Sequence, residues 1–160
     1  MSIFIFGYGA LINPREIKQI YPNKKIYPAK VEGLKRVFNV ETKDGRYKML
    51  GVKKSHRHWC NGVLFTVNEN ELAKLIQREK HYTPELLNKD QIIYKQSLPD
   101  FQPQDQIIYF LSKPPYRLTQ KQADALPIKP GYLNKCLSGA AAISEPFLQD
   151  FVETTENIKI

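Results

Sequence analysis

The stretch Ile3-Phe4-Ile5-Phe6-Gly7-Tyr8-Gly9-Ala10-Leu11 decides how this chain folds. Its apolar run predicts a buried strand, and the two glycines that follow break the strand with a tight turn. Asn13 and Pro14 then predict the start of a helix, because asparagine is a good N-cap and proline suits the first helical position. Glu16 stands three residues after Asn13, as in a capping box. We therefore expect a strand, a glycine-rich turn and a helix N-terminus.

The turn at residues 7–11 has two interpretations. Glycines let a backbone approach a ligand closely, and N–H groups exposed in such a turn can bind a carboxylate or a phosphate. A tight turn that only closes a core strand accounts for the same residues equally well. At this point both a binding loop and a purely structural turn remain open.

Length and composition restrict the class of protein. With 160 residues, of which 42% are hydrophobic and 25% charged, we expect one domain over residues 1–160. No apolar stretch approaches the roughly 18 residues needed to span a membrane, so we expect no membrane partner. The two cysteines, Cys60 and Cys136, are too few for a disulfide scaffold, which favours a cytoplasmic location.

The net charge of +8 is compatible with nucleic acid or another anionic partner. The basic residues are scattered, however, and acidic residues lie between them. This pattern favours a solvated surface, and we expect no nucleic-acid partner.

His56, His58 and Cys60 alternate and could bind a metal from one face of a strand. Since no fourth ligand is evident, we expect an exposed loop there and no metal.

Strand signals fill most of the first two thirds of the chain. Asp44-Gly45 predicts a hairpin, and Asn61-Gly62 predicts a second turn. Further strands are predicted at residues 63–67, 91–95 and 106–111, and helices at 69–80, at 132–141 and after Ser144. This order predicts an α+β fold, and many short strands favour a small, closed or nearly closed β-barrel.

Glu79 breaks the pattern of the predicted helix. On a helical wheel it falls in the middle of the apolar stripe of Leu72, Leu75 and Ile76. Burial and the helix dipole in the last turn both raise the pKa of such a carboxyl. A raised carboxyl pKa suits a general acid or base near neutral pH. The alternatives are a structural glutamate paired with an arginine or lysine, or a side chain that reaches solvent where the helix ends.

Three segments, in this order, resemble the gamma-glutamylcyclotransferase-like family. Residues 6–11, Phe-Gly-Tyr-Gly-Ala-Leu, resemble its N-terminal Tyr-Gly-Ser loop. Residues 62–65, followed by a helix that ends in Arg-Glu-Lys-His-Tyr at residues 78–82, resemble the segment with its catalytic glutamate. Residues 131–140 resemble its late helix with Tyr-Leu and Gly-Ala. Together the segments span about residues 3 to 140.

The resemblance implies a small mixed β-barrel flanked by helices. It also implies cyclisation of a gamma-glutamyl group to 5-oxoproline, with release of an amine, amino acid or peptide and without a cofactor or metal. Glu79 would be the catalytic acid and base. The backbone of the turn would bind the α-carboxylate of the substrate, and two tyrosines would line the pocket. The implied substrate-binding residues are Tyr8, Gly9, Ala10, Leu11 and Tyr132.

Ala10 stands where the family usually has serine. If the turn binds through its backbone, alanine is tolerated, whereas loss of a hydroxyl contact would lower affinity or shift specificity. This departure motivates an alternative function, a non-catalytic module of the same fold that senses a gamma-glutamyl or other anionic metabolite. The motifs leave the leaving group open among glutathione, other gamma-glutamyl peptides and gamma-glutamyl amines. A monomer or a weak homodimer is expected.

Overall fold

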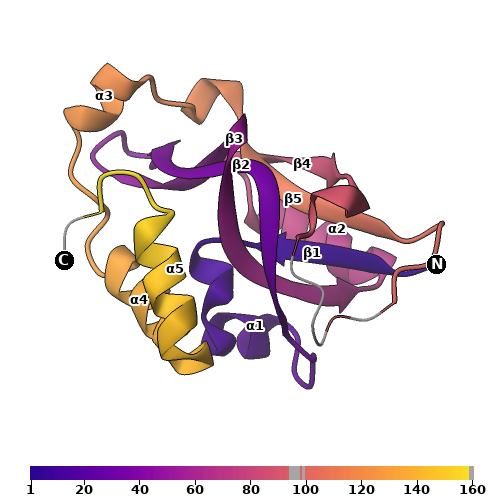
Figure 1. Cartoon of the computed structure of the whole chain (residues 1–160). Helices are drawn as coiled ribbons and strands as arrows, with labels where there is room; N and C mark the ends of the chain where they lie inside the picture. The colour runs from indigo at the N-terminus through magenta and orange to yellow at the C-terminus, as the bar shows by residue number, and fades with distance from the viewer. Residues whose placement is uncertain (94–97, 99, 159–160) are drawn as a thin grey trace.

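A computed structural model describes residues 1–93, 98 and 100–158 of the chain (Figure 1). In this part, five strands form one sheet in the order β2-β3-β1-β5-β4. The strands are β1 (Ile3–Gly7), β2 (Tyr27–Glu41), β3 (Lys48–Val67), β4 (Tyr82–Leu87) and β5 (Gln106–Ser112). The β1–β5 pair is parallel and the other pairs are antiparallel. The long strands β2 and β3 bend, so the mixed sheet curls into a half-barrel.

Helices flank the curled sheet, which confirms the predicted α+β architecture. The α-helices are α1 (Pro14–Ile20), α2 (Glu69–Arg78), α3 (Gln120–Asp124), α4 (Tyr132–Ile143) and α5 (Glu145–Glu153). Short 3₁₀ turns are η1 (Ala10–Ile12), η2 (Lys89–Gln91) and η3 (Pro114–Tyr116). Figure 1 shows α4 and α5 side by side near α1. None of the helices in the described part of the chain is long and apolar enough to cross a membrane.

Strand β1 lies in the middle of the sheet and is buried along its whole length. Successive side chains of a strand point to opposite faces. Accordingly, Ile3 and Ile5 pack in one hydrophobic cluster, while Phe4 and Phe6 pack in another. A strand that is covered on both faces requires a continuous apolar run, which explains the sequence Ile-Phe-Ile-Phe.

The predicted turn after β1 is present and is tight. A Cβ atom at Gly7 would lie 2.8 Å from the Cβ of Leu11, so only glycine fits there. The chain then enters η1, and Asn13 caps α1 by accepting a hydrogen bond from the Arg15 N–H at 2.9 Å. The predicted capping box is wrong in its second half, because the Glu16 carboxylate forms ion pairs with other elements instead.

The glycine dipeptides at 44–45 and 61–62 differ in their outcome. The first forms the predicted hairpin between β2 and β3, with Gly45 at φ 71°. The predicted turn at 61–62 is wrong, because both residues lie inside β3. A Cβ atom at Gly62 would collide with the Gly7 carbonyl and the Phe6 ring. The glycine therefore serves close strand packing rather than a turn.

Further differences concern β4 and β5. The strand predicted at 106–111 is confirmed as β5, whereas the strand predicted at 91–95 is wrong at its start. Gln91 lies in η2, and Ile92 forms only an isolated bridge with Val31. Residues 94 and 95 lie outside the described residues. Strand β5 pairs with β1 on one side and with β4 on the other, and the sequence did not predict β4.

The loop predicted around residues 56–60 is wrong, because these residues belong to β3. His56 and His58 are exposed, whereas Cys60 is buried. The long hairpin of β2 and β3 continues through this segment, so the dipeptide at 61–62 does not interrupt it. Within residues 1–93, 98 and 100–158, no group of three or more His, Cys, Asp or Glu side chains could hold a metal ion.

Candidate functional site

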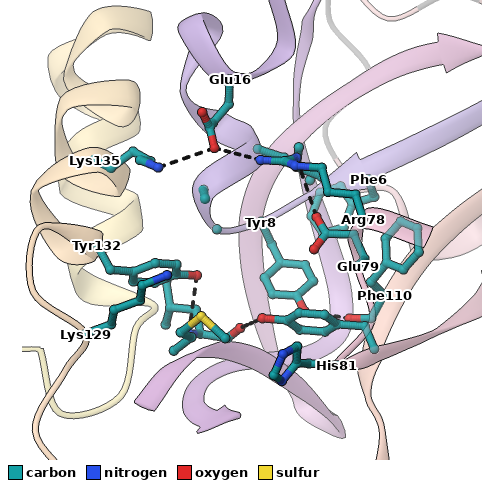
Figure 2. Close-up of a pocket in the computed structure, with 17 residues that line it drawn as sticks. Phe6, Tyr8, Glu16, Arg78, Glu79, His81, Phe110, Lys129, Tyr132 and Lys135 are labelled. Atoms are coloured by element: carbon teal, nitrogen blue, oxygen red, sulfur yellow. Dashed lines mark hydrogen bonds and ion pairs between the residues drawn. The ribbon is translucent and has the colours of Figure 1, made fainter. Parts of the chain in front are cut away.

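A pocket of about 280 Å³ lies between the turn after β1, the end of α2 and the start of α4 (Figure 2). Every residue that the sequence predicted for the site lines this pocket. These residues are Tyr8, Gly9, Ala10, Leu11, Glu79 and Tyr132. They come from three segments that are far apart in the sequence, so the fold is what brings them together.

The turn forms one wall of the pocket. The buried Tyr8 side chain donates a hydrogen bond from its hydroxyl to the Phe110 carbonyl at 2.5 Å. Burial raises the pKa of the Tyr8 phenol well above its ordinary value. Ala10 and Leu11 begin η1, and the first N–H groups of a helical turn have no acceptor within the turn. The turn thus presents backbone donors beside a neutral phenol.

Glu79 lies at the C-cap of α2, where the helix ends. Its side chain is 21% exposed, and its carboxylate accepts no hydrogen bond from the described part of the chain. The nearest cation is the Arg78 guanidinium, with Nη1 3.8 Å from Oε1 of Glu79. Burial raises the pKa of the Glu79 carboxyl, the charge of Arg78 opposes this shift, and the charge of Glu16 adds to it. This carboxylate can therefore hold or release a proton closer to neutral pH than an ordinary glutamate.

Two tyrosines secure the opposite wall at Leu50 of β3. The Leu50 N–H donates to the Tyr132 hydroxyl at 3.3 Å, and the Tyr82 hydroxyl donates to the Leu50 carbonyl at 2.8 Å. Figure 2 shows Tyr132 and Glu79 entering the pocket from different sides. A Cβ atom at Gly9 would lie 3.0 Å from the Tyr132 hydroxyl oxygen. The missing side chain at Gly9 thus lets the turn and this hydroxyl approach closely.

The position of α4 depends on another glycine. A Cβ atom at Gly139 would lie 2.5 Å from the Cα of Asn13, so α4 packs directly on the start of α1. The Asn13 amide also donates to the Lys135 carbonyl of α4 at 3.0 Å. These contacts fix where Tyr132 enters the pocket.

Charged residues that the sequence did not predict surround the pocket mouth. Glu16 of α1 pairs with Arg78 at 2.7 Å and with Lys135 of α4 at 3.3 Å. Lys129 also lines the pocket, and its ammonium has no ion pair with the described residues. The only sequence signal for these residues is the proximity of Glu16 to the glycine turn, and the spacing of Glu16 from Asn13 predicts a capping role instead. Lys129 and Lys135 carried no local signal.

Arg36 of β2 supports the turn from beneath and is fully buried. Its Nε donates to the Tyr8 carbonyl at 2.8 Å, and Nη2 donates to the backbone and side-chain oxygens of Asn61. Its Nη1 donates to the Phe151 carbonyl and to the hydroxyls of Thr154 and Thr155 at the end of α5.

The sequence contains a signal that could have identified Arg36. Alternate residues of a strand lie on one face, and this spacing places Arg36 between Leu34 and Phe38 on an apolar strand face.

Cys136 of α4 is a core thiol. It is fully buried, and burial raises the pKa of its thiol to about 12. A thiol with this pKa carries little thiolate at neutral pH, so the geometry does not favour Cys136 as a nucleophile. Within the pocket, the carboxylate of Glu79 is the better candidate for chemistry.

No protein-family model matches the chain, and no curated protein matches it in sequence. Solved structures do resemble it. A gamma-glutamyl cyclotransferase aligns with a TM-score of 0.70 and 13% identity, over 100% of this chain and 92% of the other. An uncharacterised protein from Homo sapiens aligns with a TM-score of 0.70 and 14% identity, over 99% and 92%.

A yeast gamma-glutamyl cyclotransferase specific to glutathione aligns less closely, with a TM-score of 0.58 and 15% identity over 96% of this chain and 95% of the other. Identities this low establish the fold alone. The chain therefore has the gamma-glutamyl cyclotransferase fold, as the three sequence segments predicted.

Proposed function

We propose that this chain is an enzyme that cyclises a gamma-glutamyl group to 5-oxoproline and releases an amine, amino acid or peptide. The observation that carries the proposal is the Glu79 carboxylate. It lines the same pocket as the turn at residues 7–11, burial raises its pKa, and no hydrogen bond from the described residues occupies it. A carboxylate in this state is suited to accept a proton from a ligand.

Glu79 would act first as a base and then as an acid. It takes a proton from the α-ammonium of the substrate, and the freed lone pair attacks the side-chain γ-carbonyl carbon. The new ring C–N bond forms, and the original γ-amide C–N bond breaks. The protonated Glu79 returns its proton to the leaving nitrogen, and the ring nitrogen loses its second excess proton, which the released amine takes up as it becomes an ammonium. Because each proton taken is given back, the reaction balances without an external oxidant, reductant or water.

The turn would hold the other end of the amino acid. The N–H groups of Gly9, Ala10 and Leu11 would bind the α-carboxylate, which places the α-amine near Glu79. The Tyr8 hydroxyl is engaged with Phe110, so Tyr8 would act as a wall rather than as a donor. Ring closure is intramolecular, so much of the rate enhancement would come from holding the cyclising conformer.

The alternative, a sensor of the same fold, is favoured by one observation. Ala10 lines the pocket without a hydroxyl, at the position where the family usually has serine. A sensor would bind a gamma-glutamyl compound and leave it intact.

A panel of gamma-glutamyl peptides and gamma-glutamyl amines tests the proposal, with 5-oxoproline and free amine measured together. Each compound is paired with its α-glutamyl isomer, which has the same composition but no γ-amide. We expect equal amounts of both products from at least one gamma-glutamyl compound and none from its isomer. Thermal stabilisation by gamma-glutamyl compounds without product would support the sensor. Neither product nor stabilisation across the panel would refute both functions.

A further inference from the structure

Resting on the proposed function, we propose that Glu16 is a positioning residue of the site. Its carboxylate holds the Arg78 guanidinium and so prevents a close ion pair between Arg78 and Glu79. Glu79 is thereby left open to take a proton from the substrate. Glu16 itself touches neither of the reacting groups in this scheme and acts through Arg78.

The first support is the placement of Glu16. Its sequence position suits a capping box, yet its carboxylate is directed into the pocket and is 14% exposed. There it meets Arg78 from α2 and Lys135 from α4 on one oxygen, Oε1. Figure 2 shows Glu16 between these two cations. A surface carboxylate that only capped its own helix would not join three helices in this way.

The second support is the geometry of Arg78, which stands next to Glu79 in the sequence. The Arg78 Nη2 lies 2.7 Å from Oε1 of Glu16, which is within hydrogen-bond distance. The Arg78 Nη1 lies 3.8 Å from Oε1 of Glu79, which is too far for a hydrogen bond. Arginine commonly binds a carboxylate through two parallel hydrogen bonds. Because Glu16 takes one side of the guanidinium, such a two-bond pair with Glu79 is not formed here.

The third support is the set of charges that face Glu79. Arg78 lowers its pKa, while Glu16 and burial raise it. The phenols of Tyr8, on the turn, and Tyr82, on β4, feel the Glu79 charge, and burial keeps both neutral. The other ionisable side chains that line the pocket are His81, Lys129, Tyr132 and Lys135. Arg78 is thus the cation best placed to neutralise Glu79, and Glu16 is the group that restrains it.

The test compares wild type, Glu16→Gln, Arg78→Gln and the double variant Glu16→Gln/Arg78→Gln. Glu16→Gln removes a negative charge that itself raises the pKa of Glu79, and it also releases Arg78 toward Glu79, so the titration of Glu79 should move to lower pH by about one unit. In the Arg78→Gln background only the direct charge effect of Glu16 remains, so adding Glu16→Gln there should shift the titration by clearly less than it does in the wild type. Glu156→Gln is the matched control, since it removes a partly buried ion pair with Lys35 far from Glu79 in the sequence.

Glu79 is titrated by NMR of its side-chain carboxyl carbon, assigned by its absence from Glu79→Gln. This readout needs no turnover, so it remains informative if the proposed cyclisation is wrong. With an active substrate, the acidic limb of kcat/KM should show the same shift and the same dependence on Arg78. A titration that is unchanged in Glu16→Gln, or a shift that is equally large in the Arg78→Gln background, would overturn the proposal. Loss of activity in Glu16→Gln without any shift would indicate a purely structural role, which also overturns it.

Discussion

The molecule contains two charged side chains that its apolar pattern should exclude, and their surroundings differ sharply. Arg36 lies under the turn, and its guanidinium nitrogens donate to carbonyl and hydroxyl oxygens on all sides. It also lies 4.1 Å from the Phe151 ring centroid. Glu79 lies above the same turn, and its carboxylate accepts no hydrogen bond from the described residues.

This contrast separates a structural charge from a functional one. A buried charge whose hydrogen bonds are all made within the protein has no capacity left for a ligand. Arg36 therefore fixes the turn, β3 and the end of α5 in one arrangement. The half-buried Glu79 retains its capacity and faces a cavity. Under the proposed function, the first residue positions the turn and the second performs proton transfer.

The largest expected effect is that of Arg36→Met on folding. The substitution removes the Arg36 donors from the buried carbonyls of Tyr8, Asn61 and Phe151, so we expect a loss of about 3–5 kcal/mol in the free energy of unfolding. Denaturant unfolding measures it. Arg57→Met, at an exposed site on β3, is the control and should change the value by no more than about 0.5 kcal/mol. Equal stabilities of the two variants would show that Arg36 is not the structural member of the pair.

A second prediction concerns how stability changes with pH in Glu79→Gln. Because the folded-state pKa of Glu79 is raised, the folded protein holds this proton more tightly than the unfolded chain does. The stability that the wild type gains from this tightly held proton, relative to Glu79→Gln, should therefore be greatest below the ordinary glutamate pKa of about 4.3. Wild type should lose stability relative to Glu79→Gln as the pH rises through the folded-state pKa.

Asp105→Asn provides a control of opposite sign for this series. Backbone N–H groups of Gln102 and Ser2 lower the pKa of the Asp105 carboxyl. Wild type should therefore lose stability relative to Asp105→Asn as the pH falls. Unfolding free energies across the acidic range measure both differences. A Glu79→Gln difference that does not change with pH would mean that this carboxyl titrates normally.

The smallest expected effect is that of Ala10→Ser, on the turn between the two charges. A serine hydroxyl here would reach into the pocket and add one neutral hydrogen bond to the substrate. Such a bond contributes about 1 kcal/mol, so KM should fall by about fivefold, with little change in the stability of the fold. Steady-state kinetics on an active gamma-glutamyl compound measure it. A raised KM would show that the backbone alone serves the substrate and that the hydroxyl obstructs it.

Local chemistry was sufficient to predict some parts of this molecule. The hairpin at Asp44-Gly45 and the helix that begins at residue 69 follow from turn residues and helical spacing that act within a few positions. Glu79 was identifiable because a charge on an apolar helix face is visible in the spacing alone. The same reasoning, with a period of two, would have identified Arg36.

Other parts depend on contacts between distant segments. Gly62 carries a turn signal, yet the packing of Phe6 and Gly7 decides its role. The pairing of β4 with β5, and the parallel pairing of β5 with β1, leave no mark in the local sequence. The same holds for the ion pairs of Glu16, whose partners lie more than 60 residues away in the sequence.

The rate of 5-oxoproline formation in Glu79→Gln tests the central claim most directly. The control is Glu85→Gln, which removes a half-buried carboxylate of β4 that does not line the pocket. With circular dichroism confirming that both variants are folded, we expect Glu79→Gln to lose a hundredfold or more in kcat, about the contribution of a general base. Glu85→Gln should retain the wild-type rate. Equal rates in the two variants would contradict the assignment of proton transfer to Glu79.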